Sequence, residues 1–128
     1  MKAFDNASKI DSTIIAETYI SGNEYAIPIL NNAALPIIEI KPKTNFYNFD
    51  AKYNRQDTEF ICPANLYEEF VEKINEKALN AFFSLGCTGY GRVDFMMDDK
   101  KELFFIEVNT IPGFTDHKIG RASCRERV

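Results

Sequence analysis

Apolar residues recur at helical spacing in one long segment, residues 65–85. This spacing predicts a helix with a single buried face. Asn65 can cap its first turn, Glu68 completes a capping-box pattern, and Gly86 provides the usual C-terminal stop. We expect this helix to pack on a sheet. Its predicted buried face consists of Phe70, Ile74, Ala78, Ala81, Phe82 and Leu85.

Shorter apolar runs predict the strands of that sheet. They cover residues 13–17, 25–30, 35–40, 92–97 and 103–109. Asn31-Asn32 is a turn signal between the second and third runs, and a charged turn separates the last two. Residues 41–64, a polar and aromatic stretch with a proline near each end, are expected to form a long loop. The pattern predicts an α+β fold with a mainly antiparallel sheet flanked by helices.

Composition narrows the class of protein. The 128 residues are enough for one modest domain. Their formal net charge of -4 gives no sign of the basic surface that nucleic-acid binding requires. No apolar run reaches the roughly 18 residues of a membrane span, and the first residues lack the apolar core of a signal peptide. The three cysteines are widely spaced, so a reduced cytoplasmic setting is the simplest interpretation.

The last predicted hairpin carries the chemical signal. Because side chains alternate between the faces of a strand, Arg92 and Asp94 share one face of the first strand, and Glu107 and Asn109 share one face of the second. A turn centred near residue 100 places Asp94 across from Glu107. The same register places Arg92 across from Asn109. The residues predicted on the opposite face of the second strand are Phe104, Ile106 and Val108.

Two adjacent carboxylates repel each other unless something neutralises them. Carboxylate and amide oxygens suit Mg2+, which also binds nucleotide phosphates. Arg92 beside them could clamp a phosphate or a developing oxyanion. The alternative from spacing alone is a solvated strand face with ordinary ion pairs. Pro112-Gly113 follows the hairpin; its glycine would let backbone N–H groups approach a ligand, although a plain turn is the commoner outcome.

Several segments together resemble one family. Residues 89–95 (GYGRVDF) and 106–115 (IEVNTIPGFT) resemble the signature of D-alanine:D-alanine ligases, which belong to the ATP-grasp superfamily. Residues 16–24 (AETYISGNE) resemble the nucleotide hinge of that family, and residues 46–53 (FYNFDAKY) resemble its mobile active-site loop. The resemblance implies the carboxy-terminal ATP-grasp domain, with part of the central nucleotide-binding subdomain.

The resemblance also implies a reaction and its ligands. ATP would phosphorylate the carboxylate of one D-alanine, and the amine of a second D-alanine would then displace phosphate, giving D-alanyl-D-alanine for peptidoglycan. The two Mg2+ ions, or Mn2+ in their place, would be held by Asp94, Glu107 and Asn109. The nucleotide would be contacted by Glu17, Tyr19, Ile20, Glu24, Lys52 and Ile106. The catalytic roles would fall to Arg92, Tyr53 and the Gly113 backbone N–H.

The resemblance divides the chain into three parts. Residues 1–20 are expected to end the central subdomain and form the hinge, and residues 21–117 to form a truncated carboxy-terminal domain. Residues 118–128 contain four basic residues and one acidic residue, and one back-translation of residues 119–128 resembles a sequencing-adapter read-through. We therefore expect this tail not to be native, rather than a frayed basic terminus. The parent enzyme is expected to be a homodimer, and the fragment to be inactive alone.

Two other functions are compatible with the residues. The metal-binding hairpin recurs across ATP-grasp enzymes, so another carboxylate–amine ligase of that superfamily is the first alternative. The DAKY and NTIPGFT segments argue against it. A non-catalytic nucleotide-binding remnant is the second alternative, and the presence of the whole set of metal and arginine residues argues against that one.

Overall fold

The computed structural model describes residues 2–42 and 58–112. Its elements are α1 (Lys2–Ala7), β1 (Gly22–Leu30), β2 (Ala33–Ala34), β3 (Ile38–Pro42), β4 (Thr58–Ile61), α3 (Glu68–Ser84), β5 (Tyr90–Asp98) and β6 (Leu103–Asn109). Within these residues the strands form one sheet in the order β4-β3-β1-β5-β6, with β2 paired to β1. Every described pairing is antiparallel, which confirms the predicted fold class.

The centre of the sheet is formed by β1 and β5, which pair along nine residues from Gly22↔Asp98 to Leu30↔Tyr90. Each central strand then forms a hairpin with a neighbour nearer the edge of the sheet. The Asn31-Asn32 turn is confirmed, because both residues adopt positive φ angles of 50° and 64°. Left-handed backbone suits asparagine better than most residues, so this dipeptide reverses the chain at low cost.

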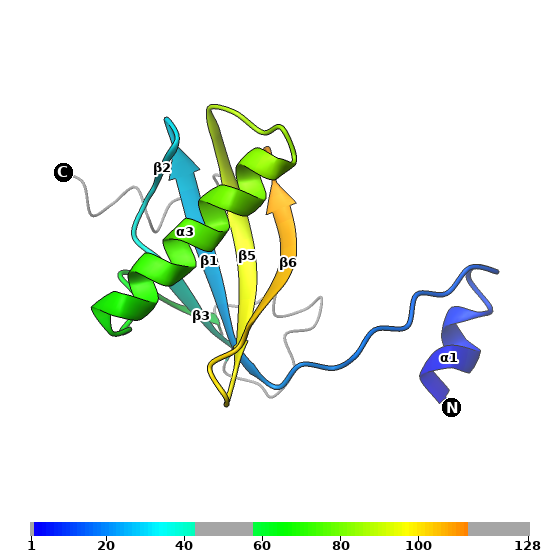
Figure 1. The fold of residues 1–128 in the computed structure, drawn as a ribbon. Helices are drawn as coiled ribbons and strands as arrows, with labels where there is room; N and C mark the ends of the chain where they lie inside the picture. Colours follow the sequence, from blue (N-terminus) through cyan, green and yellow to red (C-terminus); the bar gives the residue numbers. More distant parts are fainter. Residues whose placement is uncertain (1, 43–57, 113–128) are drawn as a thin grey trace.

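Helix α3 crosses one face of the sheet (Figure 1) and supplies its main core. Ile74, Ala78 and Phe82 are fully buried on the predicted face of the helix. They pack with the side chains that β1 and β5 direct to the same side of the sheet. Leu85, predicted on that face, is instead 64% exposed because the helix ends beside it. Gly86 confirms the predicted stop, with φ 72° and an N–H that donates to the Phe83 carbonyl at 2.9 Å.

The start of this helix differs from the prediction. The helix begins at Glu68 rather than near Asn65, and Tyr67 in extended conformation precedes it without a side-chain cap. The reason lies in the preceding connection, where the Ala64 N–H donates to the Ile37 carbonyl at 2.8 Å. This bond ties residue 64 to the residue that precedes β3, and residues 65–67 then form the connection to the helix, with Tyr67 in the cap position.

Two further expectations about local structure were wrong, and one helix was not foreseen. Residues 13–17 form no strand: they lie in an extended and largely exposed segment, with Ile15 82% exposed. The expected loop 41–64 contains β4, which pairs with β3 from Glu39↔Ile61 to Pro42↔Thr58. Helix α1, at the far end of the extended segment from the sheet (Figure 1), had no predicted counterpart. Within the described residues no helix is long and apolar enough to cross a membrane.

Candidate functional site

The hairpin of β5 and β6 brings the predicted polar residues together. Arg92 is paired with Asn109, and Asp94 is paired with Glu107, as predicted from the position of the turn. Asp98 fixes that turn, because its Oδ1 accepts the backbone N–H groups of Lys100 at 2.9 Å and Glu102 at 2.8 Å. The register of the polar row therefore follows from a short turn that is itself held by a carboxylate.

A β-bulge lies immediately beside this row. The register shifts between Asp94 and Phe95, so that Phe95 pairs with Phe105 and Ile106 is left as the additional residue. Consequently Phe104 lies across from Met96, on the same face as Asp94, and its predicted placement on the opposite face was wrong. A one-residue insertion reverses the facing of every position beyond it. Nothing in the local sequence, such as a glycine, signals this bulge.

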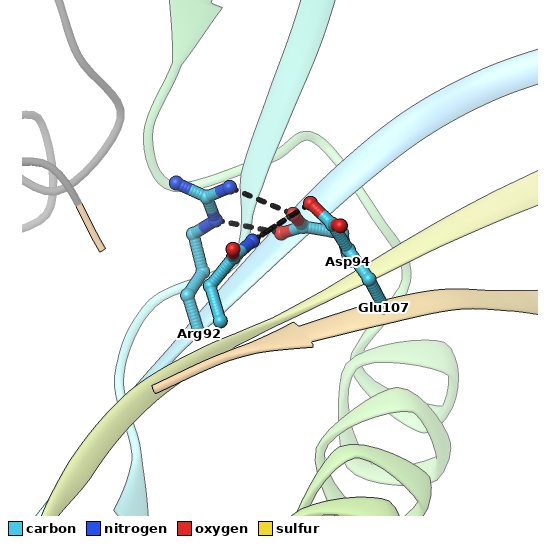
Figure 2. Close-up of polar contacts among 4 residues, drawn as sticks. Arg92, Asp94 and Glu107 are labelled. Carbon is cyan, nitrogen blue, oxygen red and sulfur yellow. Dashed lines mark hydrogen bonds and ion pairs between the residues drawn. The ribbon is translucent and has the colours of Figure 1, made fainter. Parts of the chain in front are cut away.

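The four polar side chains form one hydrogen-bonded cluster (Figure 2). Arg92 donates two hydrogen bonds of 2.7 Å to Asp94, one from Nε to Oδ1 and one from Nη2 to Oδ2. The Asn109 Nδ2 donates to Asp94 Oδ2 at 3.0 Å and to Glu107 Oε1 at 2.8 Å. The side chains of Arg92 and Asp94 are only 12% and 5% exposed, whereas Glu107 is exposed. The cluster thus has a buried ion pair on one side and a solvated carboxylate on the other.

The electrostatic environment of the cluster favours additional positive charge. Burial raises the pKa of Asp94 above its ordinary value; Arg92 and Asn109 partly offset this, and the charge of Glu107 adds to it. Burial alone would lower the pKa of the Arg92 guanidinium, but Asp94, Glu107 and Glu24 raise it above its ordinary value. A cation shared by the two carboxylates would relieve the repulsion between them.

The cluster also fits a hard divalent cation in its chemistry. No group of three or more His, Cys, Asp or Glu side chains converges within residues 2–42 and 58–112. Asp94 and Glu107 with the Asn109 amide nevertheless make a set of oxygen donors, which Mg2+ prefers. Asn109 directs its Nδ2 at both carboxylates, so its amide must turn over before Oδ1 can join such a set.

The remaining predicted site residues are distributed as follows. Glu24 pairs with Met96, which places it on the face of the sheet that carries Asp94, and its charge acts on Arg92. Ile106 is 47% exposed in the bulge. Glu17, Tyr19 and Ile20 lie in the extended segment before β1. Lys52, Tyr53, Gly113 and residues 118–128 lie outside the described residues.

An apolar cluster adjoins the polar row on the same face of the sheet. Ala26, Ile38 and Ile40 are fully buried there, with Phe60 and Cys62 packed against them. Ala26 is the pairing partner of Asp94 on β1. The polar row therefore has an apolar border formed by β1, β3 and β4, a part of the site that the sequence did not indicate because β4 was expected to be loop.

Comparison with known proteins gives a consistent result. The family model described as "D-ala D-ala ligase C-terminus" matches residues 1–127. The D-alanine--D-alanine ligase of Dechloromonas aromatica is 46% identical over 117 residues, which are 91% of this chain and 39% of that protein. The D-alanine--D-alanine ligase B of Chromobacterium violaceum is 44% identical over the same shares of both chains. The chain therefore spans about two fifths of the length of these relatives.

Solved structures share the fold. D-alanine--D-alanine ligase from Bacillus anthracis is similar with a TM-score of 0.76 and 31% identity, over 97% of this chain and 40% of that one. The same enzyme complexed with ATP gives a TM-score of 0.68 and 31% identity, over 85% and 34% of the two chains. VanG D-Ala:D-Ser ligase from Enterococcus faecalis gives a TM-score of 0.70 and 31% identity, over 85% of this chain and 33% of that one. The chain has an ATP-grasp fold and belongs to the family of the D-Ala-D-Ala ligase C-terminus.

Proposed function

We propose that this chain is the carboxy-terminal part of an ATP-dependent D-alanine:D-alanine ligase, which makes D-alanyl-D-alanine for peptidoglycan. The observation that carries the proposal is the polar cluster of the β5–β6 hairpin, in a chain 46% identical to a D-alanine--D-alanine ligase. A similar solved ligase is complexed with ATP, which supports ATP as the phosphate donor.

In this proposal Asp94, Glu107 and Asn109 would hold two Mg2+ ions, or Mn2+ in their place, and the bound cations would neutralise charge on the ATP phosphates. Burial of Asp94 and exposure of Glu107 give the site a fixed inner ligand and an accessible outer one. Arg92, which is bonded to Asp94 in the absence of a cation, would supply a planar guanidinium for the transferred phosphoryl group or the oxyanion that follows.

The nucleotide is proposed to lie on the face of the sheet that carries Asp94. The negative charge of Glu24 raises the pKa of Arg92, and its carboxylate would meet the ribose hydroxyls. Ile106, raised in the bulge and half exposed, would pack beneath the adenine. The hinge residues Glu17, Tyr19 and Ile20 would meet the base. Lys52, Tyr53 and the Gly113 N–H complete the proposed site from outside the described residues.

The proposal extends to the organisation of the protein. Residues 1–20 would belong to the central subdomain and hinge, residues 21–117 to the carboxy-terminal domain, and residues 118–128 would be non-native. The second substrate would also be D-alanine, and the whole enzyme would be a cytoplasmic homodimer without a nucleic-acid partner. Turnover would need parts that the relatives possess beyond the segment matched here, so we expect none from the 128-residue chain alone.

The test is an assay of ADP release by a full-length protein that carries residues 1–117. ADP formation should depend on both D-alanine and Mg2+, and Glu107→Gln should abolish it. D-serine is offered as the second substrate in a parallel reaction, since a D-Ala:D-Ser ligase has the same 31% identity to this chain as the Bacillus anthracis enzyme. ADP release without D-alanine would contradict the proposal. A mixed D-alanyl-D-serine product would show that the second substrate is D-serine.

A further inference from the structure

The carboxylate of Asp94 is almost fully occupied by protein donors. Its Oδ1 accepts Arg92 Nε at 2.7 Å, and its Oδ2 accepts both Arg92 Nη2 at 2.7 Å and Asn109 Nδ2 at 3.0 Å. A carboxylate offers about four lone-pair positions, and the fork of the guanidinium takes one on each oxygen. With the side chain only 5% exposed, little of Asp94 remains open to any other ligand.

A divalent cation and the Arg92 guanidinium would compete for these oxygens. Mg2+ binds carboxylate oxygens at about 2.0–2.1 Å. A guanidinium nitrogen at 2.7 Å from the same oxygen would then lie less than about 5 Å from the ion, well inside the distance at which salt screens charges. Both positive groups cannot remain on Asp94 without strong repulsion in a site this buried.

We propose that Arg92 gates the cation site: a divalent cation takes the Asp94 oxygens only by displacing the guanidinium, which is thereby freed to meet an anionic ligand. This inference rests on the proposed cation site and adds a coupling between cation binding and the availability of Arg92. Glu107 is the first point of contact, because it is exposed and no guanidinium bond holds its oxygens among the described residues.

The same exchange changes the state of Asn109. The Asn109 Nδ2 donates one hydrogen bond to Asp94 and one to Glu107, and so links the two carboxylates (Figure 2). An amide nitrogen cannot bind a cation, so the side chain turns over when the cation arrives. Cation binding is therefore expected to move two side-chain signals together, the Arg92 Nε–H and the Asn109 NH2.

The experiment uses the 128-residue chain and two matched variants. Arg92→Lys keeps the charge but loses the two-bond fork, so simple electrostatics predicts no change in affinity, whereas the gate predicts tighter binding. The binding of Mn2+, measured by electron paramagnetic resonance, should be roughly tenfold tighter in Arg92→Lys, the worth of a charge-assisted hydrogen bond. Lys41→Arg is the control, since Lys41 pairs with the buried Glu39 at 3.6 Å on a different part of the sheet; it should bind as wild type does.

A second measurement keeps the test independent of whether the variant folds. In the wild-type chain, titration with Mg2+ should shift the NMR signals of the Arg92 Nε–H and the Asn109 NH2 together. Unmoved Arg92 signals at saturating Mg2+, or equal Mn2+ affinity in Arg92→Lys and wild type, would overturn the gate while leaving the cation site intact. Binding that is insensitive to Glu107→Gln would instead overturn the cation site of the proposed function.

Discussion

The contact between Gly91 and Phe82 provides a sharp test of how the core supports the site. A Cβ added at Gly91 would lie 2.6 Å from Phe82 Cε2 and 3.0 Å from the Asn109 carbonyl oxygen. Carbon atoms pack at about 3.5–4.0 Å, so Gly91→Ala requires a shift of roughly 1 Å. Phe82 is fully buried, so its ring has no free space into which to swing. We expect a loss of about 1–3 kcal/mol in the free energy of unfolding.

The cause of that loss can be isolated by a double-mutant cycle. Phe82→Leu removes the Cε2 atom, so Gly91→Ala should cost at least about 1 kcal/mol less in that background. Gly22→Ala is the control, because its Cβ would overlap the backbone carbonyl of Met97, which no side-chain change at Phe82 can relieve. Urea unfolding of the 128-residue chain, followed by circular dichroism, measures all of these free energies. An equal cost of Gly91→Ala in both backgrounds would show that the Phe82 ring is not the obstacle.

Three further predictions concern the β5–β6 hairpin. Burial raises the pKa of Asp94 above its ordinary value, so the stabilisation is complete below the unfolded pKa and is lost as pH rises through the folded pKa. The stability of the wild type relative to Asp94→Asn, measured by urea unfolding, should therefore fall as pH rises through that range, and an increase would contradict this. Asp98→Ala removes the acceptor of the Lys100 and Glu102 N–H groups and should lower the free energy of unfolding by about 1–2 kcal/mol; a change within error would show that the turn holds without it. Lys101 has a φ of 66°, so Lys101→Gly should stabilise the chain by up to about 1 kcal/mol, measured against Lys100→Gly as a control that gives no gain.

The register of the functional hairpin could be predicted because it depends on local rules. A short charged turn and strict alternation were sufficient to pair Asp94 with Glu107 and Arg92 with Asn109. The bulge at Ile106 could not be predicted, because no residue with special conformational freedom marks its position. The placement of Phe104 changed with it.

Elements that depend on distant partners were the least predictable. Residues 13–17 have a strand-like composition, but a strand also needs a neighbour, and they remain exposed in an extended segment. β4 is only four residues long, and its strand structure depends on pairing with β3. The helix begins only at Glu68, after a connection in which Ala64 is bonded to Ile37, a residue far away in the sequence.

In the proposed function the polar cluster of the β5–β6 hairpin serves the ligation of D-alanine. The most direct measurement is ADP release by a full-length protein carrying residues 1–117, with and without D-alanine, alongside chromatographic identification of the product. We expect ADP formation that depends on D-alanine, with D-alanyl-D-alanine as product, and its loss in Glu107→Gln. ADP release that is unaffected by D-alanine, or that persists in Glu107→Gln, would contradict it.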